Sequence, residues 1–118
     1  MEFDELVEGL AHVLKAPDDI AGNAVWAISN LCRDSKWCTK MLATRSEWFA
    51  EVFSGLVKLT GSDDEGLLCD FSTCISLICV TSDGLDLLMK HPDWMLIVSG
   101  LLKAACSTNR DVQVNPKP

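Results

Sequence analysis

Apolar residues recur along the chain at spacings of three and four, which is the period of one face of an α-helix. No segment alternates apolar and polar residues for long enough to require a β-strand. The pattern is interrupted by clusters rich in Pro, Gly, Ser and Asp, for example at residues 17–19 and 61–65. It therefore predicts an all-α chain, with helices near residues 3–15, 19–32, 36–44, 47–60, 65–80, 84–90 and 93–106.

The helical pattern also repeats. Val-Glu-Gly-Leu at residues 7–10 returns as Phe-Ser-Gly-Leu at 53–56 and as Val-Ser-Gly-Leu at 98–101, so the three glycines are 46 and 45 residues apart. Each full unit consists of a short helix followed by two longer ones. Because helices of one to four turns cannot bury an apolar stripe alone, consecutive units are expected to stack as an α-solenoid.

Two local signals accompany the repeat. Ser62 and Glu65 have the spacing of a capping box, which predicts the start of the helix at 65–80. Trp48 and Trp94 occupy the same position in successive units, which predicts that both pack between helices.

One helix carries a more specific pattern. Residues 23–33, Asn-Ala-Val-Trp-Ala-Ile-Ser-Asn-Leu-Cys-Arg, resemble the third helix of an armadillo repeat in the importin-alpha group of nuclear import receptors, where Trp-x-x-x-Asn lines the inner groove. The order of short, longer and longer helices resembles armadillo (ARM/HEAT-like) architecture over nearly the whole chain. The resemblance implies a right-handed solenoid of about two and a half armadillo-like units. It also implies that Trp26 packs on ligand side chains and that Asn30 holds the ligand backbone.

The chemistry of this pair supports the same role independently. Trp26 and Asn30 are one turn apart and share a helix face. An indole can hold the stem of a Lys or Arg, and an Asn amide can both donate to and accept from a peptide backbone. With Asn23 and the equivalent positions of the next unit, the candidate partner-binding residues are Asn23, Trp26, Asn30, Asp70 and Thr73.

The second unit departs from the family pattern, because Thr73 and Leu77 stand where the first unit has the tryptophan and the asparagine. A single pair cannot hold a long basic signal. The alternative is that Trp26 is a partly buried packing residue and that Asn30 caps or bonds a loop.

Composition narrows the function further. The chain has 118 residues, 48% of them hydrophobic, and a net charge of −7, so one folded domain is expected. The repeat places this domain at 1–106, and the polar residues after Cys106 with the ending Asn-Pro-Lys-Pro predict a flexible tail at 107–118. An acidic chain is a poor partner for nucleic acid, which needs a basic face, but suits a neutral or basic protein or peptide. No apolar run reaches the roughly 18 residues of a membrane span.

The six cysteines form no Cys-x-x-Cys pair, and Cys69, Cys74 and Cys79 are separated by steps that turn about 140° around a helix. They are therefore predicted to be reduced, mostly buried thiols of an intracellular protein of the cytoplasm or nucleus. His12 and His91 are isolated, and no phosphate loop, nucleophile elbow or metal spacing is present. We expect no enzyme activity, no cofactor and no metal.

Three functions remain open. The first is a non-catalytic protein-binding module that presents a concave armadillo groove to a peptide or partner domain. The second is a fragment of an importin-alpha-like receptor that binds basic cargo signals. The third is a structural segment for assembly within a larger chain or for self-association through its terminal helices, which carry apolar residues that no neighbouring helix is expected to cover: Leu6, Leu10, Val13, Leu96, Ile97, Leu101 and Leu102.

Overall fold

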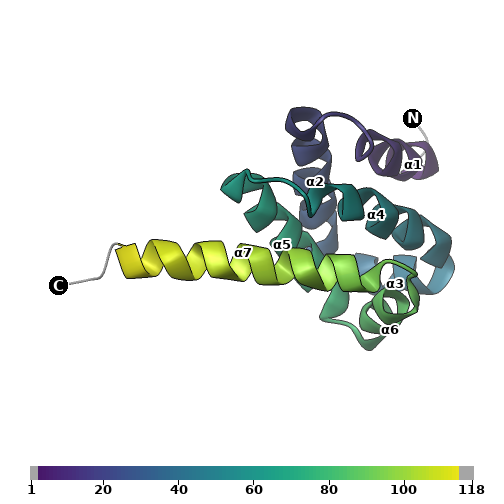
Figure 1. Cartoon of the computed structure of the whole chain (residues 1–118). Helices are drawn as coiled ribbons and strands as arrows, with labels where there is room; N and C mark the ends of the chain where they lie inside the picture. Colours follow the sequence, from purple (N-terminus) through teal and green to yellow (C-terminus); the bar gives the residue numbers. More distant parts are fainter. Residues whose placement is uncertain (1–2, 115–118) are drawn as a thin grey trace.

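A computed structural model describes the backbone of residues 3–114 and the side chains of residues 5–106. This part of the chain contains α-helices and no strand, which confirms the all-α prediction and each of the expected helices (Figure 1). They are α1 (Phe3–Val13), α2 (Asp18–Cys32), α3 (Ser35–Thr44), α4 (Ser46–Leu59), α5 (Glu65–Cys79), α6 (Ser82–Lys90) and α7 (Trp94–Val114).

Helix α7 ends at Val114, beyond the predicted end at residue 106. The intervening sequence contains weak helix formers such as Ser107 and Asn109, but no Pro or Gly that would stop a helix. Residues 115–118 of the expected tail lie outside the described residues. Within the described residues no single helix has the length and apolar character needed to cross a bilayer, and α5 and α6 reach them only as a pair bent by 115°.

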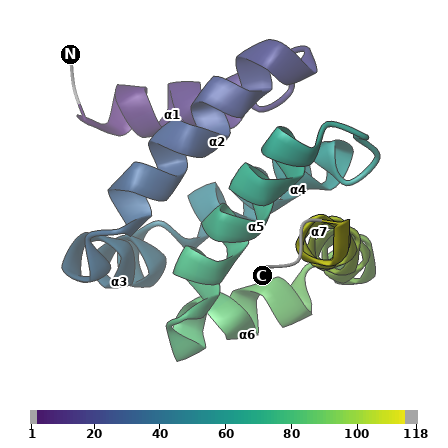
Figure 2. The ribbon, with the colours of Figure 1, turned by 90° about the vertical axis from the view of Figure 1, so that its left-hand side faces the viewer.

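The helices pack in three rows. Helix α1 packs against α4, which packs against α7; α2 packs against α5; and α3 packs against α6 (Figures 1 and 2). Figure 2 shows α2 and α5 running side by side across one face of the molecule. Helices at equivalent positions of the 46-residue repeat are therefore neighbours in space.

The core lies between these rows, and its residues in α4 are more completely buried than their equivalents in α1. Val52, Leu56 and Leu59 of α4 are completely buried. The equivalent positions of α1 are less protected, since Leu6 is 40% exposed and Leu10 is half-buried. The difference follows from position, because α4 has a neighbour on each side in its row whereas α1 has a neighbour on one side only.

Two of the repeated glycines mark close approaches between units. A Cβ at Gly55 would lie 2.7 Å from the Leu14 Cβ, and a Cβ at Gly100 would lie 2.7 Å from the Thr60 Cγ2. Leu14 and Thr60 are themselves equivalent positions, each one residue after the end of α1 or α4. The same close contact therefore joins the first unit to the second and the second to the third.

A lysine three residues after each glycine completes this contact. The Lys58 ammonium donates to the carbonyl oxygens of Leu14, at 3.5 Å, and Ala16. The Lys103 ammonium donates to the Ser62 carbonyl oxygen at 2.6 Å and pairs with the Asp63 carboxylate at 3.3 Å. Each lysine thus donates to carbonyl oxygens in the loop that follows the preceding helix of the row. No helical N–H group is available to these oxygens.

Trp48 packs between helices, as predicted. Its side chain is 4% exposed, its Nε1 donates to the Val7 carbonyl oxygen of α1, and its ring meets that of Phe49 edge-on at 4.9 Å. Trp94, at the same position of α7, is half-buried against the core.

The predicted capping box at Ser62 and Glu65 is wrong. Helix α5 is capped by Asp64, whose carboxylate accepts the Leu67 N–H at 3.1 Å. The Ser62 hydroxyl instead accepts the Asp64 N–H at 3.0 Å, within the turn before the helix. Ser62 lies two residues before the actual N-cap, Asp64, because Glu65 is the first helical residue rather than the third.

Substitution by alanine is expected to have opposite effects on stability at two of the repeated glycines. Gly100→Ala should lower the free energy of unfolding by roughly 1–3 kcal/mol, because the new methyl group overlaps Thr60 and Phe71. Gly9→Ala should raise it by up to about 1 kcal/mol, because nothing lies within 4 Å of a Cβ there and alanine favours the helix. Urea unfolding followed by circular dichroism at low protein concentration checks both. Equal effects at the two positions would contradict the close contact.

Candidate functional site

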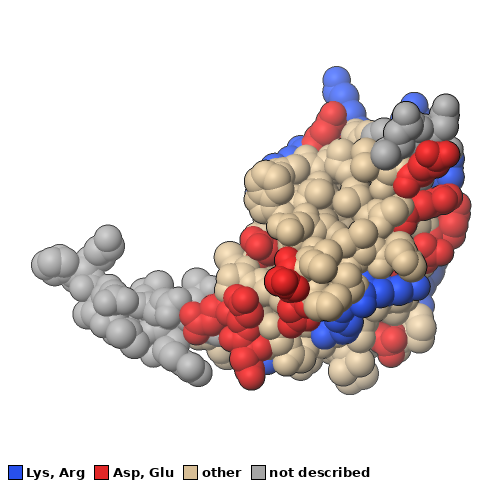
Figure 3. All heavy atoms as spheres, turned by 90° about the horizontal axis from the view of Figure 1, so that it is seen from above, with Lys and Arg blue, Asp and Glu red and all other residues tan. Residues whose placement is uncertain are grey.

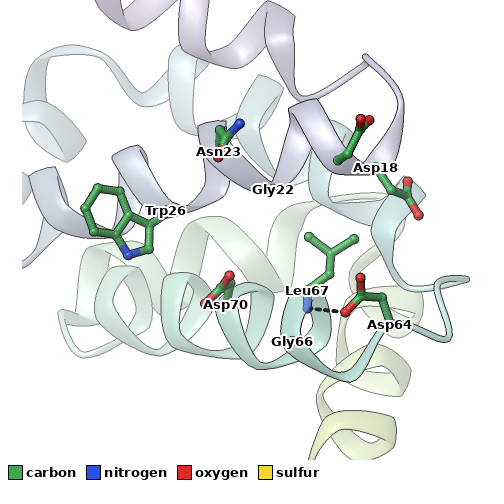
Figure 4. A pocket seen from close by; sticks show the side chains of 9 residues that line it. Asp18, Gly22, Asn23, Trp26, Asp64, Gly66, Leu67 and Asp70 are labelled. Atoms are coloured by element: carbon green, nitrogen blue, oxygen red, sulfur yellow. Dashed lines mark hydrogen bonds between the residues drawn. The ribbon is translucent and has the colours of Figure 1, made fainter.

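The candidate site is an open groove of about 480 Å³ between α2 and α5, called here the α2–α5 groove (Figure 4). The groove exists because the two helices run side by side in the same direction. Residues from the N-terminal part of each helix therefore face the same space. Its lining residues are Asp18, Asp19, Gly22, Asn23 and Trp26 of α2, with Asp64, Gly66, Leu67 and Asp70 of α5 and its cap.

Trp26 is 63% exposed and does not belong to the core, so it is not the partly buried packing residue of the alternative interpretation. The core stripe of α2 runs through Ala21, Val25 and Ile28, and Trp26 points away from it. In Figure 4 the indole lies at one end of the groove, while Asp18 and Asp64 lie at the other. A large apolar ring left in water beside carboxylates is a surface available to a ligand.

The structure brings together three of the five predicted site residues. Asn23, Trp26 and Asp70 line the α2–α5 groove, and Asn23 and Trp26 are exposed. Asn30 is also exposed, one turn beyond Trp26, but it lies outside the lining. Thr73 is half-buried, also lies outside the lining, and donates its hydroxyl to the Cys69 carbonyl oxygen at 3.0 Å.

Three further carboxylates, those of Asp18, Asp19 and Asp64, were not predicted as site residues. The helix dipole accounts for acidic residues at helix starts, and Asp64 does cap α5. A signal for their common location was nevertheless present, because Asp18 and Asp64 are 46 residues apart and so begin equivalent helices of neighbouring units.

With Asp70, these residues place four carboxylates in the groove, and no Lys or Arg is among its lining residues. On the face shown in Figure 3, acidic side chains gather in several clusters, and Lys and Arg side chains are also present at several places. A low-dielectric wall with charge of one sign concentrates ligands of the opposite sign. The groove is therefore suited to cations, and its indole favours cations on an aliphatic stem.

One pair of side chains resembles a catalytic arrangement, and sequence analysis did not detect it. Ser54 Oγ and His91 Nε2 are 2.9 Å apart, although the residues are 37 positions apart in the chain. His91 Nδ1 accepts the Asp93 N–H at 3.1 Å, so the neutral ring carries its proton on Nε2 and donates it to Ser54. The Ser54 hydroxyl in turn donates to the Ala50 carbonyl oxygen at 3.1 Å.

This arrangement is the reverse of an activated serine, because a general base must present an unprotonated nitrogen to the hydroxyl. The pair instead joins α4 to the turn between α6 and α7, with the His91 ring edge-on to Phe53 at 6.1 Å. No group of three or more His, Cys, Asp or Glu side chains among the described residues has a geometry for a metal ion.

The six cysteines are all free thiols, but they are less uniformly buried than predicted. Cys32, Cys38 and Cys74 are buried and Cys79 is half-buried, whereas Cys69 and Cys106 are exposed. Burial raises the pKa of the Cys74 thiol to about 12 and that of the Cys79 thiol to about 11. A hydrogen bond with Cys38, together with burial, also raises the pKa of Cys32.

These environments predict an order of reaction with a thiol reagent. Iodoacetamide at about pH 8 should modify Cys69 and Cys106 first, because the reagent reaches only solvent-accessible thiols. Cys74, with its raised pKa and complete burial, should react only when the protein unfolds. Mass spectrometry of peptides over a time course measures the order. Early modification of Cys74 in the folded protein would contradict this burial.

The exposure of Trp26 predicts a small effect on folding. Trp26→Ala should change the free energy of unfolding by less than about 1 kcal/mol, as surface substitutions usually do. Phe71→Ala, at a fully buried position of α5, should cost roughly 3–5 kcal/mol and serves as the comparison. Urea unfolding of the two variants makes the measurement. A loss of several kcal/mol for Trp26→Ala would place the indole in the core.

Comparisons with protein-family models, with curated proteins and with solved structures find no match to this chain. A functional interpretation of the α2–α5 groove therefore depends on its residues, their exposure and their charge.

Proposed function

We propose that this chain is a non-catalytic protein-binding module, an armadillo-type right-handed solenoid that holds an extended basic peptide segment in the α2–α5 groove. The observation that carries the proposal is the exposed indole of Trp26 in the same groove as four carboxylates. Neither feature belongs to the core. The indole matches the aliphatic stem of a Lys or Arg side chain, and the carboxylates match its charged end.

The helix rows support the solenoid part of the proposal. Units of a solenoid contact mainly their neighbours, and equivalent helices line up along the stack. Here α1, α4 and α7 form one row, and α2 and α5 form another. In armadillo architecture the third helices of successive units line the inner groove, and α2 and α5 hold that position in the proposed repeat.

The binding mode follows from the arrangement of the lining residues. The aliphatic stem of one Lys or Arg lies on the Trp26 indole with its charged end toward Asp70, which lies next along the groove in Figure 4. The Asn23 amide is placed to hydrogen-bond the peptide backbone. A second basic side chain reaches the carboxylates of Asp18 and Asp64 at the far end.

Magnitudes limit the expected affinity. An exposed cation–π contact contributes about 0.5–1 kcal/mol and an exposed ion pair about 0–1 kcal/mol, so the groove binds a short basic segment weakly. Because its carboxylates are open to solvent, the affinity falls as salt rises. Only the first unit offers a tryptophan and an asparagine, so the preferred ligand is a short segment with one or two basic residues at its centre.

A peptide titration tests the proposal. A fluorescein-labelled eight-residue peptide of Lys, Arg and Gly should bind, and the same length of Asp, Glu and Gly should not. Trp26→Ala should weaken binding roughly tenfold, which corresponds to about 1.4 kcal/mol, because both the packing against the aliphatic stem and the cation–π contact are lost. Asp70→Asn should weaken binding several-fold and reduce its salt dependence. Fluorescence anisotropy measures all four.

Two variants outside the groove are matched controls. Val80→Ala removes an apolar side chain that is 78% exposed, and Asp86→Asn removes an exposed carboxylate of α6 that pairs with Lys90 at 2.8 Å. Both should leave peptide affinity unchanged. Equal binding of the acidic peptide, or full affinity in Trp26→Ala, would contradict the proposal.

A further inference from the structure

Helices α1 and α7 stand at the two ends of the α1–α4–α7 row. Each leaves uncovered one of the two surfaces that pack together where successive units meet in this row. The front face of α1 is defined here by Leu6, Gly9 and His12. The back face of α7 is defined by four residues spaced at three and four along the helix: Met95, Val98, Leu102 and Ala105. Each face has covered equivalents elsewhere in the same row.

The front face is covered in both later units. The equivalents of Leu6 are Val52 in α4 and Ile97 in α7, and both are completely buried, whereas Leu6 is 40% exposed. A Cβ at Gly55 would meet the preceding unit at 2.7 Å, whereas nothing lies within 4 Å of a Cβ at Gly9.

His12 holds the position of the two interface lysines. Lys58 and Lys103, at the equivalent places of α4 and α7, donate to the carbonyl oxygens of the loop before them. His12 is exposed, and its unit has no such loop in front of it within the described residues. The front face of α1 therefore has the glycine and the basic side chain of the inter-unit contact without the partner.

The back face is covered in both earlier units. Val7, Ala11 and Leu14 of α1 are at most 2% exposed beneath α4. In α4, Phe53 is completely buried, and Val57 and Thr60 are half-buried beside α7. On α7 the equivalents of these residues are less covered: Val98 is half-buried, Leu102 is 63% exposed and Ala105 is exposed, and Met95, one turn before Val98, is 68% exposed.

We propose that a second copy of this chain binds head-to-tail, with the back face of α7 in one copy packed on the front face of α1 in the next. This contact repeats in register the two that already exist within the chain, α1 on α4 and α4 on α7. Ala105 would lie against Gly9 as Leu14 lies against Gly55. Met95 and Leu102 would leave water, which supplies the driving force.

The geometry of the contact sets how the association grows. Its two sides are different surfaces, so each added copy leaves one free front face and one free back face, and the product is a linear chain rather than a closed dimer. Only the α1–α4–α7 row continues across it. The buried area is therefore small for a protein interface, and the association is weak and concentration-dependent.

Sedimentation velocity over a roughly hundredfold range of concentration tests for such growth. The experiment is done with a reductant, so that the exposed Cys106 cannot crosslink copies. The weight-average sedimentation coefficient should rise continuously past the dimer value. Gly9→Gln should abolish the rise by blocking the front face, and Leu102→Glu should abolish it by placing a charge in the back face.

Two controls change the same helices outside these faces. Glu8→Gln alters an exposed residue of α1, and Leu96→Gln removes an apolar side chain of α7 that is 49% exposed. Both should self-associate as the unaltered chain does. Circular dichroism of all four variants should show the same helix content, because all the altered positions are open to solvent.

A mixing experiment distinguishes the head-to-tail contact from symmetric pairing. Gly9→Gln retains its back face and Leu102→Glu retains its front face, so an equimolar mixture should form a dimer that grows no further. A chain that stays monomeric at every concentration would overturn the proposal. So would association that survives both substitutions, that is lost in only one of the two variants, or that does not return in the mixture.

Discussion

The close approach of successive units at Gly55 and Gly100 sets the spacing on which the other contacts depend. At each glycine the backbone of one helix comes within side-chain distance of the loop that ends the preceding helix of its row. A lysine three residues later satisfies carbonyl groups in that loop. This spacing packs α1 on α4 and α4 on α7, while α2 packs on α5 in the second row.

The α2–α5 groove is a consequence of that second row. Because the equivalent helices α2 and α5 lie side by side, their acidic first turns lie side by side too. Four carboxylates therefore gather in the groove, although Asp18 and Asp19 are far in sequence from Asp64 and Asp70. Carboxylates at helix starts are favourable for each helix alone, through capping and the dipole. The exposed indole of Trp26 lies in the same groove as these carboxylates.

Repetition also explains why exposure varies between equivalent residues. On one side Leu6 is 40% exposed whereas its equivalents Val52 and Ile97 are buried, and on the other side Ala11 is buried and Val57 half-buried whereas their equivalent Leu102 is 63% exposed. Chemistry does not distinguish these positions, since all are apolar. A surface that is interior in one unit is open to solvent in another, because burial depends on whether a neighbour is present.

The sequence by itself determined the helices, their repeat and the face on which Trp26 lies, because these depend on spacing within a helix and on breakers nearby. It did not determine which acidic residues share the groove, that Asp64 rather than Ser62 caps α5, that Cys69 and Cys106 are exposed, or that His91 meets Ser54. Those features join residues up to 52 positions apart, as Asp18 and Asp70 are, or depend on where one helix begins. They follow from how helices pack against one another, which the period of a single helix does not encode.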